Sequence, residues 1–326
     1  MRAIVVRAPG GPEQLDLARV PAPELTSGTV EIEIKACALN RADLLQRRGH
    51  YLPPQGASEI LGLECAGVVR SVAPDVAGIE LGSRVMALLA GGGYAERAVV
   101  SAGLVMPIPK GFSFAQAAAI PEAFLTASEA LFTLGAVGPG QLVLIHAAAS
   151  GVGTAALQLA KLSGARVIAC ASTPEKLEFL RKLGADVVVN HRLEDFAQRC
   201  QEQSDGRGVD VILDFVGGAY AERHQTCLAV AGRWVVIGLL GGAQAKLDLA
   251  AVLRRRWQLL GLVMRSRPLA EKCAIVAAFQ SRFLPEFGRG RLAPQIDRLY
   301  PWSEVRAAHE RMEQNQNQGK IVLEIG

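Results

Sequence analysis

Residues 145–160, IHAAASGVGTAALQLA, indicate the fold class, because they join the end of an apolar strand, a turn of small residues and the start of a helix. The fingerprint G-x-G-x-x-G would place its glycines at Ala148, Ser150 and Gly153, of which only the last is glycine. Small residues let a phosphate approach the backbone, and a helix N-terminus supplies N–H groups and the positive end of a dipole. We predict a phosphate-binding turn. Helix–strand packing without a ligand is the alternative for the motif in isolation.

The segments around this turn alternate between strand and helix patterns. The expected strands are 142–148, 166–172, 186–190, 209–217, 232–239 and 257–264, and the expected helices are 122–136, 153–165, 173–185 and 193–203. Such alternation predicts βαβ units, a parallel twisted sheet and an α/β fold. Residues 1–110 instead show short strand patterns separated by Gly and Pro, and the chain ends with a helix and a strand. In this context a dinucleotide becomes the expected ligand of the turn.

The end of the next strand discriminates between dinucleotides. NAD sites commonly place an Asp or Glu about 20 residues beyond the glycines. Here the strand ends at Ser172 and Thr173 without an acid, and Lys176, His191 and Arg192 follow at the same expected edge of the sheet. Hydroxyls and cations suit a 2′-phosphate, so we predict NADPH. The alternatives are an ordinary helix lysine at Lys176 and a solvated loop arginine at Arg192.

Composition limits the possible functions. Of the 326 residues half are apolar and a fifth are charged, with a formal net charge of +4, which is typical of a globular protein. The six cysteines form no Cys-x-x-Cys pair, which argues against structural zinc and against a disulfide framework. The longest basic run, at 254–256, is too short to favour nucleic acid. We find no signal-peptide or membrane-span pattern and expect a cytoplasmic protein.

Several motifs together resemble one family. They are NRADLLQRRGHY (40–51), LGLECAGVV (61–69), LIHAAASGVGTAALQLAK (144–161), KLGADVVVNH (182–191), GRWVVIGL (232–239) and NQGKIVLEI (317–325). The chain resembles the zinc-lacking quinone oxidoreductases of the medium-chain dehydrogenase/reductase superfamily, closest to the tumour-suppressor-inducible subgroup. The resemblance implies a GroES-like catalytic domain at 1–121, an inserted Rossmann NADP-binding domain at 122–264, a return to the catalytic domain at 265–326, a cleft between the two domains, and a homodimer.

The positions of the zinc ligands differ from those of the zinc-dependent relatives. Those relatives carry Cys where this chain has Asn40 and His where it has Leu63, while Glu64 remains. A catalytic zinc normally needs three protein ligands, so no metal site is expected and Glu64 is interpreted as a buried structural carboxylate. Without a Lewis acid, alcohol oxidation is disfavoured. Quinones and conjugated enones or enals, whose reduced products are stabilised anions, are the expected acceptors.

The resemblance also implies site residues. Tyr51 matches a residue that contacts substrate, with a loop tyrosine as the alternative, and Asn40 would orient rather than donate a proton. Arg41 and Asp43 are interpreted as an ion pair at the start of a helix. The residues expected to bind the cofactor are Thr126, Ser150, Gly151, Val152, Ser172, Lys176, His191, Gly217, Gly238, Leu239 and Asn315. Many relatives have Gly in place of Ser150 and Tyr in place of His191.

The predicted function is that of an NADPH-dependent quinone oxidoreductase that transfers hydride without a metal. The alternative within enzymes is an NADPH-dependent reductase of enone, enal or enoyl-thioester double bonds. For a thioester carrier, the basic stretches 265–268 and 289–291 offer positive charge. A second alternative is a dinucleotide- or nucleic-acid-binding protein with little turnover. The sequence leaves the physiological acceptor open.

Overall fold

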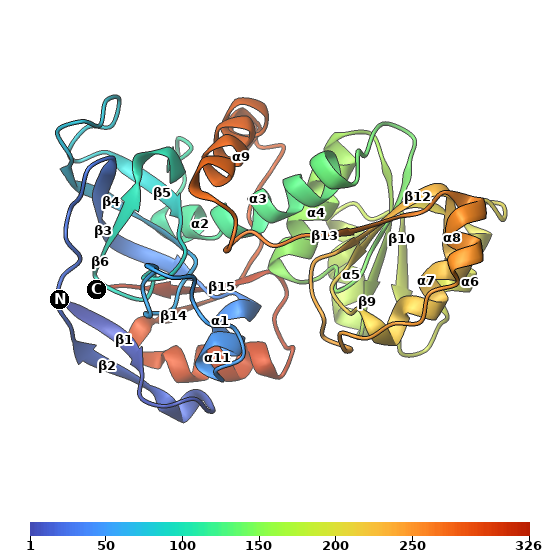
Figure 1. The fold of residues 1–326 in the computed structure, drawn as a ribbon, viewed down its shortest axis with the longest axis horizontal. Helices are drawn as coiled ribbons and strands as arrows, with labels where there is room; N and C mark the ends of the chain where they lie inside the picture. Colours follow the sequence, from blue (N-terminus) through green and yellow to red (C-terminus); the bar gives the residue numbers. More distant parts are fainter. The chain divides into compact units, whose positions relative to one another are not determined.

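The computed structural model describes all residues 1–326, and its internal contacts divide the chain into two compact units. The first unit comprises Met1–Leu125 and Met264–Gly326, and the second comprises Thr126–Val263 (Figure 1). The predicted α/β fold is therefore built from one continuous unit and one made of two separate pieces of chain. No helix combines the length and apolarity needed to cross a membrane.

The second unit contains a six-stranded sheet in which every pairing is parallel. Its strands are β8 (Leu142–Ile145), β9 (Arg166–Ala171), β10 (Val187–Asn190), β11 (Val209–Asp214), β12 (Leu228–Val236) and β13 (Gln258–Gly261). The spatial order is β10-β9-β8-β11-β12-β13, which is the doubly wound Rossmann arrangement. The strand order reverses between β8 and β11. Ligands of such sheets bind beyond the carboxyl ends of the strands at this point.

Helical segments precede the first of these parallel strands and connect the others. They are the π-helical turn η3 (Glu129–Leu134), α4 (Gly151–Leu162), α5 (Pro174–Lys182), α6 (Phe196–Glu202), the 3₁₀ turn η4 (Gly218–Tyr220), α7 (Ala221–Cys227) and α8 (Leu249–Arg255). Four of them begin after a side chain that caps a backbone N–H, namely Ser150, Thr173, Asp195 and Asp248. These residue types satisfy the N–H groups that a helix start leaves unpaired. The helix starts are therefore encoded locally.

Several predicted elements differ from the structure in extent; the strand expected over 257–264, for example, is limited to β13 (Gln258–Gly261). The helix expected over 122–136 is α3 (Pro121–Ser128) followed by η3. Strand β12 begins at Leu228, because this residue already pairs with Val209 before the register shifts. In the irregular stretch that follows, Ala231 has a φ of 59°. The sequence pattern identified only the regular part of this strand.

The first unit contains a seven-stranded, mainly antiparallel sheet and a separate two-stranded sheet of β1 and β2. Its strands are β1 (Arg2–Val6), β2 (Leu15–Arg19), β3 (Thr29–Ala38), β4 (Glu64–Val72), β5 (Arg84–Leu88), β6 (Arg97–Ser101), β7 (Val105–Pro107), β14 (Ile296–Pro301) and β15 (Lys320–Glu324). Figure 1 shows the C-terminal strand β15 in red beside the blue strand β3, with which it pairs antiparallel. Lys320 is thereby placed next to residues near the end of β3.

Short helices complete the first unit. They are η1 (Pro12–Gln14), α1 (Arg41–Arg47), η2 (Ala102–Leu104), α2 (Phe114–Ala118), α9 (Leu269–Arg282), α10 (Leu284–Gly288), η5 (Trp302–Glu304) and α11 (Val305–Glu313). Helix α1 starts directly after β3, and Asn40 and Asp43 form a capping box at its N-terminus. This box fixes the direction in which the chain leaves the sheet toward Tyr51.

Candidate active site

The turn after β8 has the geometry of a phosphate-binding turn. Ala147 has a φ of 43°, a left-handed conformation that is uncommon for a residue other than glycine. The Ser150 hydroxyl accepts a hydrogen bond of 3.1 Å from the Gly153 N–H and caps α4, which leaves the hydroxyl hydrogen available to donate. A Cβ atom at Gly153 would lie 2.6 Å from the carbonyl oxygens of Ala147 and Ala148. The glycine is therefore required by the close packing of helix and turn.

Gly151 and Val152 are the first two residues of α4. Their N–H groups have no partner within the helix and lie at the positive end of a 12-residue helix. This arrangement suits the pyrophosphate of a dinucleotide, as predicted for the motif.

The edge of the sheet next to β9 carries hydroxyls and cations. Ser172 follows the last residue of β9, and the Thr173 hydroxyl caps α5 by accepting from the Lys176 N–H at 3.4 Å. The His191 N–H donates to the Ala171 carbonyl at 3.2 Å, which brings the end of β10 beside that of β9. The sequence expectation that Ser172, Lys176 and His191 share one edge is thus compatible with the backbone pairing.

His191 is surrounded by positive charge. Burial lowers the pKa of its imidazole, and the nearby Arg192, Arg223 and Lys176 lower it further. Its Nδ1 lies 2.9 Å from the Tyr220 hydroxyl, and the Arg223 guanidinium lies 4.4 Å from the centre of the Tyr220 ring. A neutral imidazole among three cations provides a place for an anionic group such as a 2′-phosphate.

The chain after β11 forms a second tight turn. Asp214 Oδ1 accepts hydrogen bonds from the N–H groups of Val216 and Gly217, at 2.7 and 2.9 Å. Gly217 has a φ of 78°, and a Cβ there would lie 2.6 Å from the Gly242 carbonyl oxygen. The turn therefore needs glycine at this position.

Gly238 and Leu239 follow strand β12 and lie beside this turn. The Gly238 N–H donates to the Asp214 backbone carbonyl at 3.2 Å, and the Leu239 side chain is 54 % exposed. Leu239 therefore presents an apolar side chain next to the turn, where a ligand can cover it.

Thr126 lies in α3, at the first position of the second unit. Its side chain is only 6 % exposed and its Oγ1 atom has no hydrogen-bond partner within the protein. A buried hydroxyl is normally paired, so this atom is available to a bound ligand. The two glycine turns, the helix N-terminus, the cations and this hydroxyl together fit a nicotinamide dinucleotide.

A second set of polar residues lies in the first unit, around the buried carboxylate of Glu64. The Lys320 ammonium donates to Glu64 Oε1 at 2.6 Å, to Asn40 Oδ1 at 2.7 Å and to the Leu39 carbonyl at 2.7 Å. Glu64 Oε1 also accepts from Asn40 Nδ2 at 2.9 Å, and Oε2 accepts from the Glu122 N–H at 2.8 Å. All three ammonium hydrogens are used, so Glu64 and Lys320 form a closed, fully bonded ion pair.

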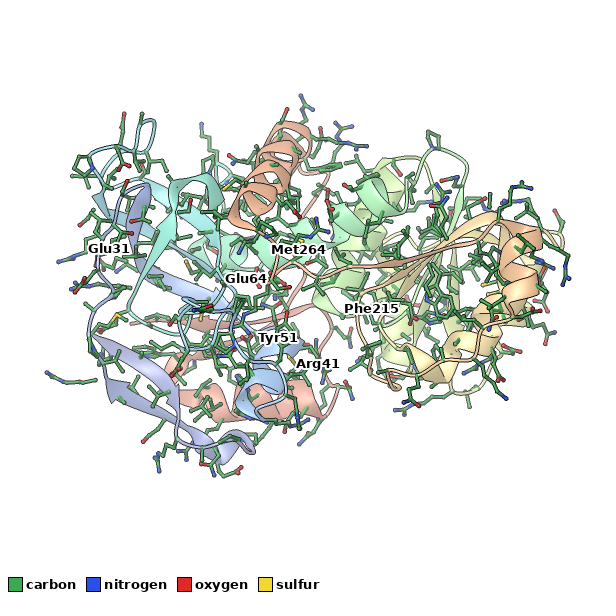
Figure 2. All side chains as sticks on the ribbon, viewed as in Figure 1. Glu31, Arg41, Tyr51, Glu64, Phe215 and Met264 are labelled. Atoms are coloured by element: carbon green, nitrogen blue, oxygen red, sulfur yellow. The ribbon has the colours of Figure 1, made fainter.

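Tyr51, labelled in Figure 2, is half-buried in the first unit, and the ionisable groups that influence its pKa are Arg265 and Glu122. The Arg265 guanidinium carbon lies 5.3 Å from the centre of the Tyr51 ring. Burial raises the pKa of the Tyr51 phenol, and the Glu122 carboxyl raises it further while Arg265 opposes the rise. Burial also raises the pKa of Glu122 to about 8, with the charge of Glu64 adding to the effect. At neutral pH both groups hold their protons, so Tyr51 can donate a hydrogen bond to a substrate oxygen.

Family models of known proteins match two segments of the chain. The family described as alcohol dehydrogenase GroES-like domain matches residues 26–110, and the family described as zinc-binding dehydrogenase matches residues 151–279. The human synaptic vesicle membrane protein VAT-1 homolog is 31 % identical over 346 residues, covering 100 % of this chain and 87 % of the relative. The chain belongs to the medium-chain dehydrogenase/reductase superfamily.

Other members of the superfamily connect the chain with two kinds of reductase. The solved structure of a Pseudomonas syringae quinone oxidoreductase has a TM-score of 0.88 and 28 % identity, covering 99 % of both chains. That of the CurK enoyl reductase has a TM-score of 0.89 and 30 % identity, covering 100 % of this chain and 99 % of the other. A phenolphthiocerol/phthiocerol polyketide synthase protein of Mycobacterium tuberculosis is 37 % identical over 245 residues, which are 75 % of this chain but 11 % of that protein. The family and fold predictions are confirmed, within the quinone-oxidoreductase-like part of the superfamily.

The positions of the zinc ligands in zinc-dependent members hold other groups here. Asn40 is bonded to Lys320 and Glu64, and Leu63 is a buried apolar residue. No three His, Cys, Asp or Glu side chains in the chain are grouped so that they could hold a metal ion. A lysine ammonium thus supplies the positive charge beside Glu64.

One interpretation of the sequence was wrong: Arg41 and Asp43 do not form an ion pair. Asp43 accepts from the N–H groups of Asn40 and Gly62, at 2.7 and 3.0 Å. Arg41 instead donates to Asn315 Oδ1 at 2.6 Å. The carboxylate is buried under α1, where backbone donors are closer than the neighbouring side chain. Asn315 lies in the first unit, unlike the other residues expected to bind the cofactor.

Four residues of the site were missed or left without a role: Glu122, Arg223, Arg265 and Lys320. Lys320 pairs with Glu64 across 256 residues of sequence and Arg265 contacts Tyr51 across 214, so no local pattern reveals either contact. The basic stretch at 265–268 is assigned from the sequence only a role as positive charge for a thioester carrier. Its first residue is in fact 4 % exposed.

Proposed function

We propose that the protein is an NADPH-dependent quinone oxidoreductase that works without zinc. The observation that carries the proposal is the bonded set of Lys320, Glu64 and Asn40, together with Leu63, at the positions of the zinc ligands in zinc-dependent relatives. With these residues the chain lacks the ligands for a Lewis acid that would stabilise an alkoxide. Acceptors that become stabilised oxyanions need less help, and quinones belong to this class.

The second unit would hold the cofactor. Gly151 and Val152 would bind the pyrophosphate through their N–H groups, Ser150 would donate its hydroxyl hydrogen, and Thr126 would offer its unpaired hydroxyl to the nicotinamide end. Gly217, Gly238, Leu239 and Asn315 are further proposed contacts. The bound cofactor supplies the hydride, and the chain supplies binding, orientation and electrostatics.

The preference for NADPH over NADH rests on the edge beside β9. Ser172, Lys176, His191 and Arg192 would meet the 2′-phosphate, and Arg223 is a further cation that influences His191. The end of β9 carries Ser172 and Thr173 and not the acidic residue that commonly binds a ribose 2′-hydroxyl. Replacing cations at this edge should therefore weaken the binding of NADPH more than the binding of NADH.

Tyr51 is the proposed catalytic residue of the first unit. Its phenol keeps its proton at neutral pH and would donate a hydrogen bond to the acceptor oxygen as negative charge develops. Asn40 is a positioning residue, because its amide holds Glu64 and Lys320 while its backbone N–H holds Asp43. Together they would fix α1 and the segment that leads to Tyr51.

Reduction of an enone, enal or enoyl thioester is the second candidate function. The likeness to the CurK enoyl reductase and to a polyketide synthase favours it. Both functions need the same hydride donor and an acceptor whose oxygen becomes negative. NADPH oxidation measured with a panel of quinones, enones and an enoyl thioester distinguishes them, because the preferred class should have the highest kcat/KM.

We also propose a homodimer and a reducing, cytoplasmic location. Strand β13 is an edge strand whose Leu259 is 53 % exposed, and an uncovered apolar edge favours pairing with a second copy. All six cysteines are free thiols, as is usual in a reducing compartment. Light scattering at micromolar concentration tests the dimer.

A further inference from the structure

Arg265 is a buried arginine with an unsatisfied amino group. Its side chain is 4 % exposed, and its Nη2 atom has no hydrogen-bond partner. It also takes part in no ion pair, although a buried charge is normally paired. Leaving a buried charged donor unpaired costs more free energy than leaving a neutral donor unpaired. A side chain in this state needs an explanation beyond packing.

The rest of the guanidinium is held firmly in place. Nε donates to the Ala90 carbonyl at 2.7 Å and Nη1 to the Tyr51 carbonyl at 3.4 Å. The guanidinium carbon lies 5.3 Å from the centre of the Tyr51 ring. Two backbone carbonyls and one aromatic ring therefore orient the side chain, and Nη2 is left over in the same cluster as the proposed catalytic phenol.

The charged groups around Arg265 do not neutralise it. The Glu122 carboxyl influences the pKa of both Arg265 and Tyr51, and burial raises the pKa of Glu122 to about 8, so it is mostly uncharged at neutral pH. The Lys272 ammonium donates to the Arg265 backbone carbonyl at 3.4 Å and adds positive charge. Asp43 influences the pKa of Arg265 more than Glu122 does, but its carboxylate is bonded to the N–H groups of Asn40 and Gly62 and forms no ion pair with Arg265. Arg265 and Lys272 therefore add positive charge to the cluster, and no anion is bonded to Arg265.

We propose that Nη2 of Arg265 binds the acceptor oxygen that becomes negative during reduction, so that Arg265 and Tyr51 act as two donors to one oxyanion. This inference rests on the proposed function and specifies its substrate class: acceptors whose two-electron reduction gives a phenolate or enolate. Hydride transfer oxidises NADPH to NADP⁺ and converts a quinone into the hydroquinone monoanion. One proton, from Tyr51 or from water, then completes the hydroquinone, and solvent restores the phenol.

The direct test measures anion binding without turnover, with 4-nitrophenolate as the probe and NADP⁺ present. The wild-type protein should bind the phenolate in preference to the phenol, which absorption of the phenolate reports. Arg265→Gln should weaken phenolate binding by about tenfold to a hundredfold, the range expected for one charge-assisted hydrogen bond. Arg84→Gln is the matched control. Arg84 Nη2 also donates to a backbone carbonyl, that of Phe112, at 2.8 Å, and its guanidinium carbon lies 4.6 Å from the centre of the Phe114 ring, but Arg84 is exposed.

Turnover of 1,4-benzoquinone and NADPH binding are measured on the same preparations. Arg265→Gln should lower kcat by a similar factor at pH 6 and pH 7, where Arg265 keeps its charge and Glu122, with a pKa of about 8, stays mostly protonated, and leave the NADPH dissociation constant unchanged. Arg265→Lys keeps the positive charge but not the planar set of guanidinium donors. It should recover part of the loss in phenolate binding and part of the loss in kcat, and it serves as the test if the glutamine variant does not fold.

The outcomes separate the inference from the proposed function. Unchanged phenolate binding and turnover in both Arg265 variants would overturn the inference, as would a loss confined to NADPH affinity. If the wild-type protein binds phenolate through Arg265 but reduces no quinone, enone or enal, the proposed function fails while the oxyanion site stands.

Discussion

Replacing Lys320 with Met removes the only cation bonded to a fully buried carboxylate. Glu64 is 0 % exposed and the Lys320 side chain 5 % exposed, and they meet at 2.6 Å. Removing one partner of a buried ion pair costs about 3–5 kcal/mol, because the other charge is left uncompensated. Glu64 keeps the Asn40 amide and the Glu122 N–H as donors. We therefore expect a loss at the lower end, about 3 kcal/mol.

The free energy of unfolding, measured in urea, checks this value. Lys320→Met combined with Glu64→Gln should be more stable than Lys320→Met alone, since the unpaired charge is then gone. Lys35→Met is the matched control: Lys35 pairs with Glu33 on the surface, with both side chains 40 % exposed, and should lose no more than about 1 kcal/mol. Two results would show that the buried carboxylate does not depend on this cation. One is a loss below about 1 kcal/mol for Lys320→Met, and the other is a double variant with a lower free energy of unfolding than Lys320→Met alone.

Three further predictions concern the proposed site. Tyr51→Phe should lower quinone turnover by on the order of a hundredfold and leave NADPH affinity, measured by fluorescence, unchanged; full turnover would make Tyr51 a packing residue. Lys176→Glu should weaken NADPH by about tenfold or more relative to NADH, whereas Lys182→Glu, an exposed lysine of the same helix, should not; equal losses for both cofactors would remove Lys176 from the site. The pKa of Glu122 is raised from 4.5 to about 8, so its contribution to stability is present below pH 4.5 and lost as the pH rises through 8. Glu122→Gln should therefore gain stability over the wild type between pH 5 and 9, by on the order of 2 kcal/mol after allowance for partial exposure, and parallel unfolding curves across that range would count against a raised pKa.

The Rossmann sheet was predictable because its signals are local. Runs such as LVLI and RVIACA are apolar over the length of a buried strand, and Thr173 with Pro174 marks a helix start by its own chemistry. The turn at 147–153 could be read in the same way, although only Gly153 keeps the glycine pattern. Its backbone geometry follows from sterics between neighbouring residues.

The Glu64 cluster could not be predicted, because its members come from β4, β15 and the end of β3. An ion pair that joins residues 256 positions apart depends on sheet pairing and not on spacing. The wrong interpretation of Arg41 and Asp43 has the same origin. Sequence proximity favoured a salt bridge, whereas the folded chain places two backbone N–H groups closer to the carboxylate.

The proposed function requires that the chain reduce quinones with NADPH and without a metal. NADPH oxidation with 1,4-benzoquinone after exhaustive chelation measures this requirement, with zinc content determined on the same sample and NADH compared at equal concentration. We expect full activity, no stoichiometric zinc and a higher kcat/KM for NADPH. Activity that is lost with the chelator and returns with zinc, or the absence of any quinone turnover, would contradict the proposed function.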